Sequence, residues 1–394
     1  MSRLLTGILV VMALLAGISL GGHPEVLPGF VRDTLVGDED TRVVAEAIDK
    51  INDVYYRSVP EDELADAAVN GAVRSLKDRF SHYLNPEEYR RFQNSSQNAY
   101  EGVGISVVVV KKGLRIVEVY DGSPAERGGL ERGEVITAVE GRSIAGDAAE
   151  SGSDRIKGPP GTEVTLTVLD GDDDREVSLN RARVTVPIVA SRMRTAGEAK
   201  IAVVRLAGFT SGAHGEVVRA LRKLLREGAE GVVFDLRSNG GGLVSEAQLV
   251  ASAFLEEGQV VVSTKGRSVQ SKTLKAEGDA AVPDDVPVVV LVDRDTASAA
   301  EIVAGALQDH DRATVVGRRT FGKGVFQQIL DLSNGGALDI TAGQYFTPDG
   351  RNLGGQGVKT GTGIAPDVMA ADKPKTRPDE ALDKALALLV DEIR

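Results

Sequence analysis

The 394-residue chain has no cysteine and only four histidines. Without cysteine there is no disulfide bond, no thiol nucleophile and no thiolate metal site. The histidines form neither an HExxH motif nor another cluster with metal-ligand spacing; they are His23, His82, His214 and His310. We therefore expect no metal and no other cofactor. Catalysis by histidine or zinc is disfavoured, because few residues could supply the base or the metal ligands.

The chain is also short of basic residues. It has 46 Lys and Arg against 58 Asp and Glu, which gives a net charge of −12, and the basic residues are dispersed. A nucleic-acid-binding protein would need a basic surface, so this class is disfavoured. A hydrophobic content of 42% is typical of a globular protein, and 394 residues are enough for two or three domains.

A long hydrophobic run is present at the N-terminus. Arg3 precedes 19 uncharged and mostly apolar residues, 4–22, and acidic residues follow from Glu25. A positive start and an apolar run are typical of a signal peptide or a signal anchor. No clean Ala-x-Ala cleavage site follows, which favours an uncleaved anchor over a cleaved signal. We expect the rest of the chain to be exported, either membrane-anchored or secreted.

Changes in residue pattern divide the chain after the apolar segment 1–22. Residues 23–40 contain Gly, Pro and Asp with weak periodicity and are predicted to be a linker, and 41–97 carry apolar residues at helical spacing. Residues 98–183 contain β-branched runs separated by turn residues, which predicts a small β-rich domain. From 184 to 394 strands and helices alternate, which predicts a domain with a largely parallel sheet covered by helices. The predicted fold class is therefore multidomain α/β.

Functional groups of open α/β sheets gather beyond the carboxyl ends of the strands. Three such ends carry candidates: the glycine turn after Asn239, Ser298, and the loop that holds Lys323. The strands expected around them cover 201–206, 231–236, 286–292 and 314–316, and the helices cover 216–226, 243–255 and 298–309.

Ser298 follows a predicted buried strand and opens a predicted helix. The start of a helix offers free backbone N–H groups and the positive end of the helix dipole. An oxyanion formed during attack on a carbonyl would be stabilised there, chiefly by the N–H of Ala299. However, Ser298 and Glu301 also have the spacing of a capping box, so a purely structural role stays open.

Lys323 lies between two glycines within the apolar segment 321–326. Burial would lower the pKa of its amine, and a neutral amine can accept the proton of a serine without any histidine. A surface lysine in a turn is the alternative interpretation. Gly317, Gly322 and Lys323 also have most of a P-loop's spacing, but Gly324 replaces the Ser or Thr that holds magnesium, and a strand is predicted where a helix should follow.

The glycines at 240–242 are either a tight turn or a second source of oxyanion N–H groups, because glycine lets the backbone approach a substrate closely. Two histidines are candidates for a general base that would accept the proton of Ser298. His310 ends the predicted helix that Ser298 opens, roughly 18 Å away at 1.5 Å per residue. His82 lies in the N-terminal helical region, far in sequence from the sheet. Both are predicted to be structural.

Short motifs in a fixed order carry a family resemblance that covers nearly everything after residue 40. They are DRFSHYL at 78–84, GVGI at 102–105, GSPA at 122–125, GPPGT at 158–162, DLRSNGGG at 235–242, TASAAE at 296–301, FGKGVFQ at 321–327, YFTPDGR at 345–351 and IAPD at 364–367. Together they resemble the carboxyl-terminal processing peptidases, also called tail-specific proteases. These are serine proteases with a PDZ domain and a Ser-Lys dyad.

The resemblance implies a role for each matching position. Ser298 would be the nucleophile and Lys323 the general base. Gln327, four residues further on, would orient the lysine. Gly241 and Ala299 would donate the oxyanion N–H groups. The chain has Gly at position 240 where the family has Pro, and this change removes no reacting atom.

The resemblance also makes 98–183 a PDZ domain and 184–394 the catalytic domain. A PDZ domain binds a C-terminal peptide as an added strand, with the peptide carboxylate on backbone N–H groups. Here the binding loop would consist of Gly102, Val103, Gly104 and Ile105. Capturing a tail in this way raises its effective concentration at the serine.

The predicted function is thus an exported serine endopeptidase that captures unstructured C-termini and cuts near them with Ser298 and Lys323. Its partners would be proteins or peptides with apolar C-termini, the membrane through 4–22, and a regulatory activator or a second copy of the chain. Nucleic acid is not among them. The expected location is a bacterial periplasm or cell envelope. The alternative is a catalytically silent, membrane-tethered PDZ adaptor on a protease scaffold.

Overall fold

A computed structural model describes residues 39–95, 99–146, 149–170, 173–185, 187–355, 362–370 and 379–394. The predicted signal segment 1–22 and nearly all of the predicted linker 23–40 lie outside these residues. No helix in the described part of the chain is long and apolar enough to cross a membrane. The chain forms two compact units, 1–77 and 78–394.

The described part of the first unit consists of two helices, α3 (Glu39–Val54) and α4 (Glu61–Ser75). They confirm that this stretch is helical. The predicted helical region 41–97 is nevertheless divided, because β1 (His82–Leu84) and α5 (Pro86–Ser95) belong to the second unit. The reason is a long-range contact: β1 pairs with a strand more than 250 residues further on.

The β-rich module is built around one sheet in the order β3-β4-β5-β7-β8, with β6 beside β5, while β2 and β9 form a separate pair. Its core contains Ile116, Ile136, Val164 and Leu166, none of which is exposed. The predicted hairpin is confirmed as β3 and β4. The elements are β2 (Ala99–Gly102), β3 (Ile105–Val110), β4 (Gly113–Val119), α6 (Pro124–Arg127), β5 (Val135–Val139), β6 (Arg142–Ser143), α7 (Ala149–Ile156), β7 (Glu163–Asp170), β8 (Asp173–Asn180) and β9 (Ala182–Thr185).

The central sheet of the catalytic region has the order β10-β11-β12-β15-β16-β19, and all its pairs except β10–β11 are parallel. This confirms the predicted largely parallel sheet. Its strands are continuous runs of apolar residues, because helices cover both faces of the sheet. The strands are β10 (Val189–Ala196), β11 (Ala199–Leu206), β12 (Gly231–Asp235), β15 (Val288–Val292), β16 (Thr314–Gly317) and β19 (Val368–Met369).

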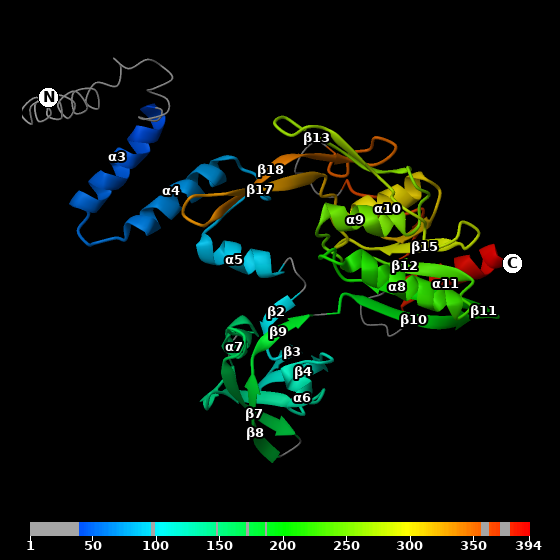
Figure 1. The fold of residues 1–394 in the computed structure, drawn as a ribbon, viewed down its shortest axis with the longest axis horizontal. Helices are drawn as coiled ribbons and strands as arrows, with labels where there is room; N and C mark the ends of the chain where they lie inside the picture. The colour runs from blue at the N-terminus through cyan, green and yellow to red at the C-terminus, as the bar shows by residue number, and fades with distance from the viewer. Residues whose placement is uncertain are drawn as a thin grey trace, which may run out of the picture. The chain divides into compact units, whose positions relative to one another are not determined.

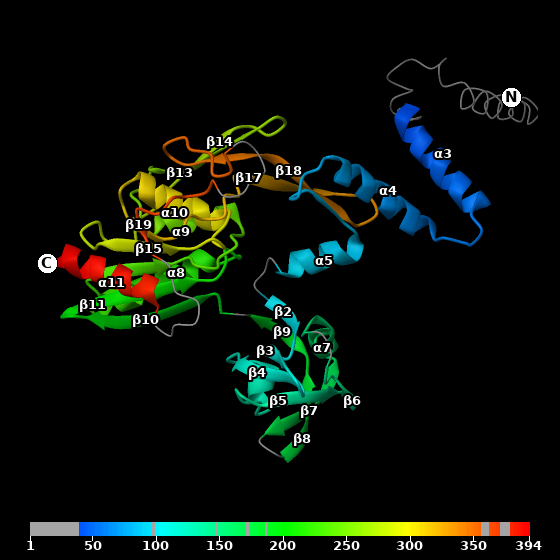
Figure 2. The ribbon, with the colours of Figure 1, turned by 180° about the vertical axis from the view of Figure 1, so that it is seen from behind.

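Helices cover the two faces of this sheet unequally. Three of them share one apolar core with side chains of one face, and these are α8 (Ala213–Arg226), α9 (Val244–Ser252) and α10 (Ala299–Asp309) (Figure 1). The other face packs against α11 (Glu380–Ile393), which Figure 2 shows from behind. Alternate residues of each strand, such as Val289 and Val290, therefore enter different cores.

A second, antiparallel sheet joins β1, β13 (Val260–Gly266), β14 (Lys272–Lys275), β17 (Val325–Asp331) and β18 (Ala337–Phe346). The strand expected after Lys323 is confirmed as β17. β18 is a ten-residue strand that pairs with β1, β13 and β17, and the residue pattern did not predict it. This sheet carries the lysine, whereas the parallel sheet carries the serine.

Candidate active site

Ser298 lies directly before α10, at the carboxyl end of β15, and is only 7% exposed. Its φ of 56° and ψ of −118° are an unusual backbone conformation for a residue with a side chain. Such a conformation costs on the order of 1–3 kcal/mol and persists only where the surroundings impose it. The helix begins at Ala299, so its first backbone N–H groups lie next to the serine, as predicted.

The carboxylate of Glu301 is completely buried and accepts four hydrogen bonds. Its Oε2 accepts from the N–H of Ser298 at 2.8 Å and from the N–H of Lys323 at 2.9 Å. Its Oε1 accepts from Thr320 Oγ1 at 2.5 Å and from the N–H of Gly322 at 2.7 Å. Burial raises the pKa of this carboxyl, and the four hydrogen bonds act in the opposite direction. The capping interpretation therefore covered only part of its role, because Glu301 also joins the serine segment to the lysine segment.

Lys323 is partly buried, and burial lowers the pKa of its amine below the ordinary lysine value, as predicted. The charges of Asp339, Asp78 and Glu301 act in the opposite direction without cancelling the effect. The Lys323 ammonium lies 4.9 Å from the centre of the Phe80 ring. Burial therefore makes the neutral form of this amine easier to reach than in an exposed lysine, whereas the face of the ring favours the ammonium.

The segment 78–84 supplies much of the environment of Lys323, which the residue pattern did not show. Asp78 accepts from the N–H of Phe80 at 3.0 Å and from Ser81 Oγ at 2.7 Å. Ser81 Oγ in turn accepts from the N–H of Thr341 on β18 at 3.0 Å. Burial works to raise the pKa of Asp78, but the hydrogen bonds to its carboxylate lower it overall. The turn thus fixes Phe80 against the lysine.

His82 follows this turn, on β1, opposite Asp339 of β18. The prediction that it lies in a helical region is wrong, because it is on β1, which pairs with β18. Its charge lowers the pKa of Asp339, although burial raises that pKa more. His310, in contrast, lies at the C-terminal end of α10, where its Nε2 contacts the carbonyl of Val260 at 2.8 Å. This position fits the structural role predicted for it.

Gln327 lies on β17, and its Nε2 donates to Thr341 Oγ1 at 3.3 Å. Within the described residues, no hydrogen bond joins Gln327 to Lys323, and none joins Ser298 Oγ to Lys323 Nζ. The structure therefore brings the backbone N–H groups of Ser298 and Lys323 to one carboxylate, that of Glu301, and does not join the two side chains directly. Because the bond to Thr341 uses Nε2, the Oε1 of Gln327 can still accept from an amine, as the orienting role predicted for Gln327 requires.

The glycine turn packs against the serine. Gly241 has a φ of +99°, and a Cβ on it would lie 2.8 Å from the Cβ of Ser298 and 2.9 Å from the nitrogen of Ala299. A Cβ on Gly240, in contrast, would meet nothing within 4 Å. The N–H of Gly241 donates to Oδ1 of the buried Asn239 at 2.9 Å. The turn is thus placed beside Ala299 as predicted, with its N–H held by an amide oxygen.

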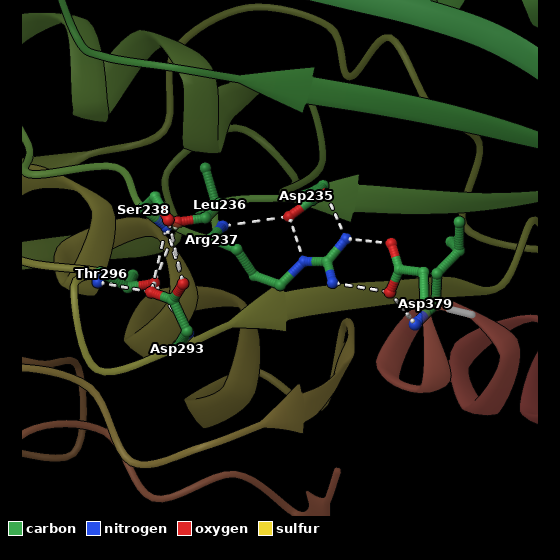
Figure 3. A network of polar contacts seen from close by, with 8 residues as sticks. Asp235, Leu236, Arg237, Ser238, Asp293, Thr296 and Asp379 are labelled. Atoms are coloured by element: carbon green, nitrogen blue, oxygen red, sulfur yellow. Dashed lines mark hydrogen bonds and ion pairs between the residues drawn. The ribbon is translucent and has the colours of Figure 1, made fainter. Parts of the chain in front are cut away.

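Arg237 leads into this turn and forms ion pairs on both sides of its guanidinium (Figure 3). Its Nη2 donates to Asp235 Oδ2 at 2.8 Å, and its Nη1 donates to Asp379 Oδ1 at 2.7 Å. Burial acts to lower the pKa of Arg237, but the two carboxylates raise it overall. Asp379 also accepts from the N–H of Leu382 at 2.9 Å and so caps α11. The last helix is therefore tied to the strand end that precedes the glycines.

A second set of contacts locks the ends of β12 and β15 together (Figure 3). The N–H of Ser238 donates to Asp293 Oδ1 at 3.0 Å, and Asp293 Oδ1 also accepts from the N–H of Thr296 at 3.0 Å. Thr296 Oγ1 donates to the carbonyl of Leu236 at 2.9 Å. These bonds hold the segment just before Ser298 against the glycine turn.

Tyr345 is a further residue at the site that the sequence prediction did not single out. It is 3% exposed, and its N–H donates to the carbonyl of Gly324 at 2.9 Å. Burial raises the pKa of its hydroxyl, and a hydrogen bond with Ser298 acts in the opposite direction. Tyr345 therefore contacts the lysine loop with its backbone and the serine with its side chain. It belongs to the motif at 345–351, for which the sequence predicts no individual residue role.

A separate groove of about 280 Å³ lies in the β-rich module. It includes three of the four residues predicted to bind a C-terminus, namely Gly102, Val103 and Ile105. The fourth, Gly104, has a φ of +91°, and a Cβ on it would lie 2.2 Å from the Cβ of Ser123, so glycine is required there. The remaining lining residues are Tyr100, Ser106, Val107, Tyr120, Ser153, Ile156 and Lys157.

Comparison with protein families gives two matches along the chain. The model of Peptidase family S41 matches residues 200–370, and a PDZ domain model matches residues 115–170. The first range contains Ser298, Glu301 and Lys323, and the second contains part of the groove. Both fall where the corresponding domains were expected.

Comparison with individual proteins gives similar results. The chain is 30% identical over 363 residues to the "Probable CtpA-like serine protease" of Staphylococcus haemolyticus, covering 92% of this chain and 72% of that protein. It is 34% identical over 327 residues to the protein of the same name from Staphylococcus aureus, covering 82% of this chain and 63% of that one. Among solved structures, the photosystem II D1 C-terminal processing protease matches with a TM-score of 0.53 and 27% identity, covering 89% of this chain and 97% of that chain.

Proposed function

The chain belongs to Peptidase family S41, among the CtpA-like serine proteases, and we propose that it is an endopeptidase that trims protein C-termini with a Ser298–Lys323 dyad. The observation that carries this proposal is the position of Glu301, whose Oε2 accepts the N–H groups of both dyad residues. A carboxylate that merely capped α10 would have no need to hold the lysine segment as well.

In the proposed reaction, Ser298 Oγ attacks the carbonyl carbon of the scissile peptide bond. The neutral amine of Lys323 takes the serine proton and later gives it to the leaving amine, and water then hydrolyses the acyl-enzyme. The N–H of Ala299 supports the oxyanion, together with the N–H of Gly241 once this group exchanges Asn239 for the substrate. Gln327 would orient the lysine in this state.

We propose that the groove of the PDZ domain captures the substrate's C-terminus. Among the described strands, β3 pairs with β4 alone, so its other edge can accept a peptide as an added strand. The loop from Gly102 to Ile105 would hold the carboxylate on its backbone N–H groups. The apolar lining, which includes Val103, Val107 and Ile156, fits an apolar tail.

We place the protein outside the cytoplasm, in a bacterial periplasm or cell envelope. Residues 4–22, with Arg3 before them and acidic residues after, support export and anchoring or secretion. A regulatory activator or a second copy of the chain would fit a resting site in which, among the described residues, no hydrogen bond joins Ser298 Oγ to Lys323 Nζ.

Cleavage of an unfolded protein with an apolar tail tests the dyad. Ser298→Ala and Lys323→Ala should each reduce kcat by on the order of 10⁴ or more. Lys265→Ala is a matched control, because the ammonium of Lys265 also lies over an aromatic ring, 5.0 Å from the centre of Phe346, but on β13. Retention of wild-type cleavage by either dyad variant would refute the proposed mechanism.

The alternative is a catalytically silent PDZ adaptor tethered to the membrane. The presence of Ser298, Lys323 and Gln327 argues against it. An irreversible serine-acylating probe separates the two functions if it is applied both alone and with a peptide that ends in an apolar tail. Labelling at Ser298 under either condition supports the enzyme. Absence of labelling under every condition supports the adaptor.

A further inference from the structure

Tyr100 lies directly beside the loop that we propose binds a substrate's C-terminus. It sits on β2, opposite Val184 of β9, a residue only 5% exposed. Its ring covers Gly102 so closely that a Cβ there would lie 2.9 Å from Tyr100 Cε2. β9 pairs with β2 and so fixes the position of Tyr100. The ring is held against the loop and lines the groove.

The hydroxyl of Tyr100 donates to the carbonyl of Ile105 at 3.1 Å. The preceding carbonyl, that of Gly104, accepts from the N–H of Tyr120 at 3.0 Å and therefore points toward β4. Successive backbone groups of a strand alternate in direction, so the carbonyl of Ile105 points toward the open edge of β3. Tyr100 thus bonds to the first acceptor on the edge to which a peptide strand would add.

The same phenol oxygen lies close to the backbone of the loop. Burial raises the pKa of the Tyr100 hydroxyl to about 12, and hydrogen bonding to the backbone of Ile105 and Gly104 acts in the opposite direction. The hydroxyl therefore stays protonated at neutral pH and continues to donate to Ile105. The same stretch of backbone is expected to hold a peptide carboxylate.

A bound C-terminus needs the same backbone groups. Its last N–H would donate to the carbonyl of Ile105, and its carboxylate would accept from the N–H groups of Gly104 and Ile105. Tyr100 already occupies the first of these positions, the carbonyl of Ile105, and its ring lies against Gly102 at the start of the loop. The groove volume of about 280 Å³ is bounded by this ring, so a peptide residue cannot take the same place until the ring moves.

We propose that Tyr100 is an internal competitor of the substrate's C-terminus, which binds to the PDZ groove by displacing the Tyr100 hydroxyl. This inference rests on the proposed capture of C-termini by the groove. The affinity for a tail is then set by a competition within the protein, because the final N–H of the peptide must replace the Tyr100 hydroxyl at the carbonyl of Ile105.

The test uses the full chain carrying Ser298→Ala, so that the probe is not cut. The probe is a fluorescein-labelled decapeptide that ends in Leu-Ala-Ala with a free carboxylate, and the same peptide with an amidated end is the comparison. Tyr100→Phe removes the hydroxyl and keeps the ring. Tyr89→Phe is the matched control, because its hydroxyl also makes one hydrogen bond, to Asp331 at 2.8 Å on β17. Fluorescence anisotropy gives the Kd of each pair.

Loss of one internal hydrogen bond should make the free-carboxylate peptide bind roughly three- to tenfold more tightly to Tyr100→Phe, with no change for Tyr89→Phe. Unchanged or weaker binding to Tyr100→Phe would overturn the competition and leave capture of C-termini intact. If neither protein binds the peptide, or if free and amidated ends bind equally, then the proposed capture itself fails and the inference falls with it.

Discussion

The two halves of the active site are built in different ways. The serine half lies at the ends of two neighbouring parallel strands, β12 and β15, whose ends are locked by Asp293 and Thr296. The lysine half lies before β17 in an antiparallel sheet and depends on a turn at 78–84 that arrives from the other end of the chain. Glu301 joins the halves. The proposed nucleophile is thus held by local contacts, whereas the proposed base is held by distant ones.

The largest expected effect tests how tightly the serine half is packed. Gly241→Ala places a methyl group less than 3 Å from Ser298 and Ala299, at a φ of +99°. Since the oxyanion position is then displaced, kcat should fall roughly 10²- to 10³-fold. Gly240→Ala is the control, because its methyl group meets open space, and it should stay within about twofold of wild type. Near-normal turnover by Gly241→Ala would show that this half is not packed as tightly as described.

The second prediction concerns the joint between the halves. Glu301→Gln places an amide NH2 against a backbone N–H donor in either orientation, against those of Ser298 and Lys323 or against that of Gly322, so kcat should fall on the order of 10²-fold and unfolding free energy by about 2–4 kcal/mol. Glu246→Gln is the control: this buried carboxylate accepts the N–H groups of Gly212 and His214 but contacts neither dyad segment. It should lose stability and keep kcat within about threefold. Urea unfolding and single-turnover kinetics separate the two effects, and equal loss of activity in both variants would contradict the joint.

The third prediction concerns the ion pair behind the serine half. Burial works to raise the pKa of Asp379, but Arg237 and the N–H of Leu382 lower it overall. Its ionised form therefore stabilises the fold above about pH 4, and this contribution is lost as the pH falls through the lowered pKa. Asp379→Asn should cost about 1 kcal/mol at pH 7, and the difference from wild type should shrink in acid. Asp391→Asn, at an exposed position of the same helix, should change little. A constant difference at all pH values would contradict the role of the charge.

The smallest expected effect concerns the lysine half. Asp339 raises the pKa of Lys323, so Asp339→Asn should lower it and move the ascending limb of the pH–rate profile to lower pH. At pH 7, where more of the amine is then neutral, kcat/KM should rise about two- to threefold. Asp331→Asn on the exposed end of β17 is the control. An unmoved profile would mean that this carboxylate does not tune the base.

The same contrast explains what could be predicted from the sequence. Ser298, its helix and the glycine turn follow each other in one βα pattern, so periodicity and spacing were enough to place them. Lys323 was placed correctly in a buried loop before a strand. The turn at 78–84 looked like a break between helices, since nothing local shows that β1 pairs with a strand more than 250 residues away.

Other features could not be predicted, because they too depend on contacts between residues that are distant in the sequence. β18 alternates apolar and polar residues only from Leu338 to Ala342, because Gly343 and Gln344 interrupt the pattern, and its full length is defined by its three partner strands. Glu301 was identified as a cap because its bond to Ser298 is local, while its bonds to Thr320 and Gly322 cross about twenty residues. Motif order identified the family, but it could not show that Gln327 bonds to Thr341.

The ion pair between Arg237 and Asp379 also has a consequence for the order of events during synthesis. The two residues are 142 positions apart, so a ribosome that has just added Arg237 has yet to make its second carboxylate. The strand end that leads into the glycine turn is therefore completed only after the final helix has emerged. A nascent chain that has not yet reached Asp379, or one terminated before it, would carry Ser298 without this support, which would delay proteolytic activity until that residue has been added.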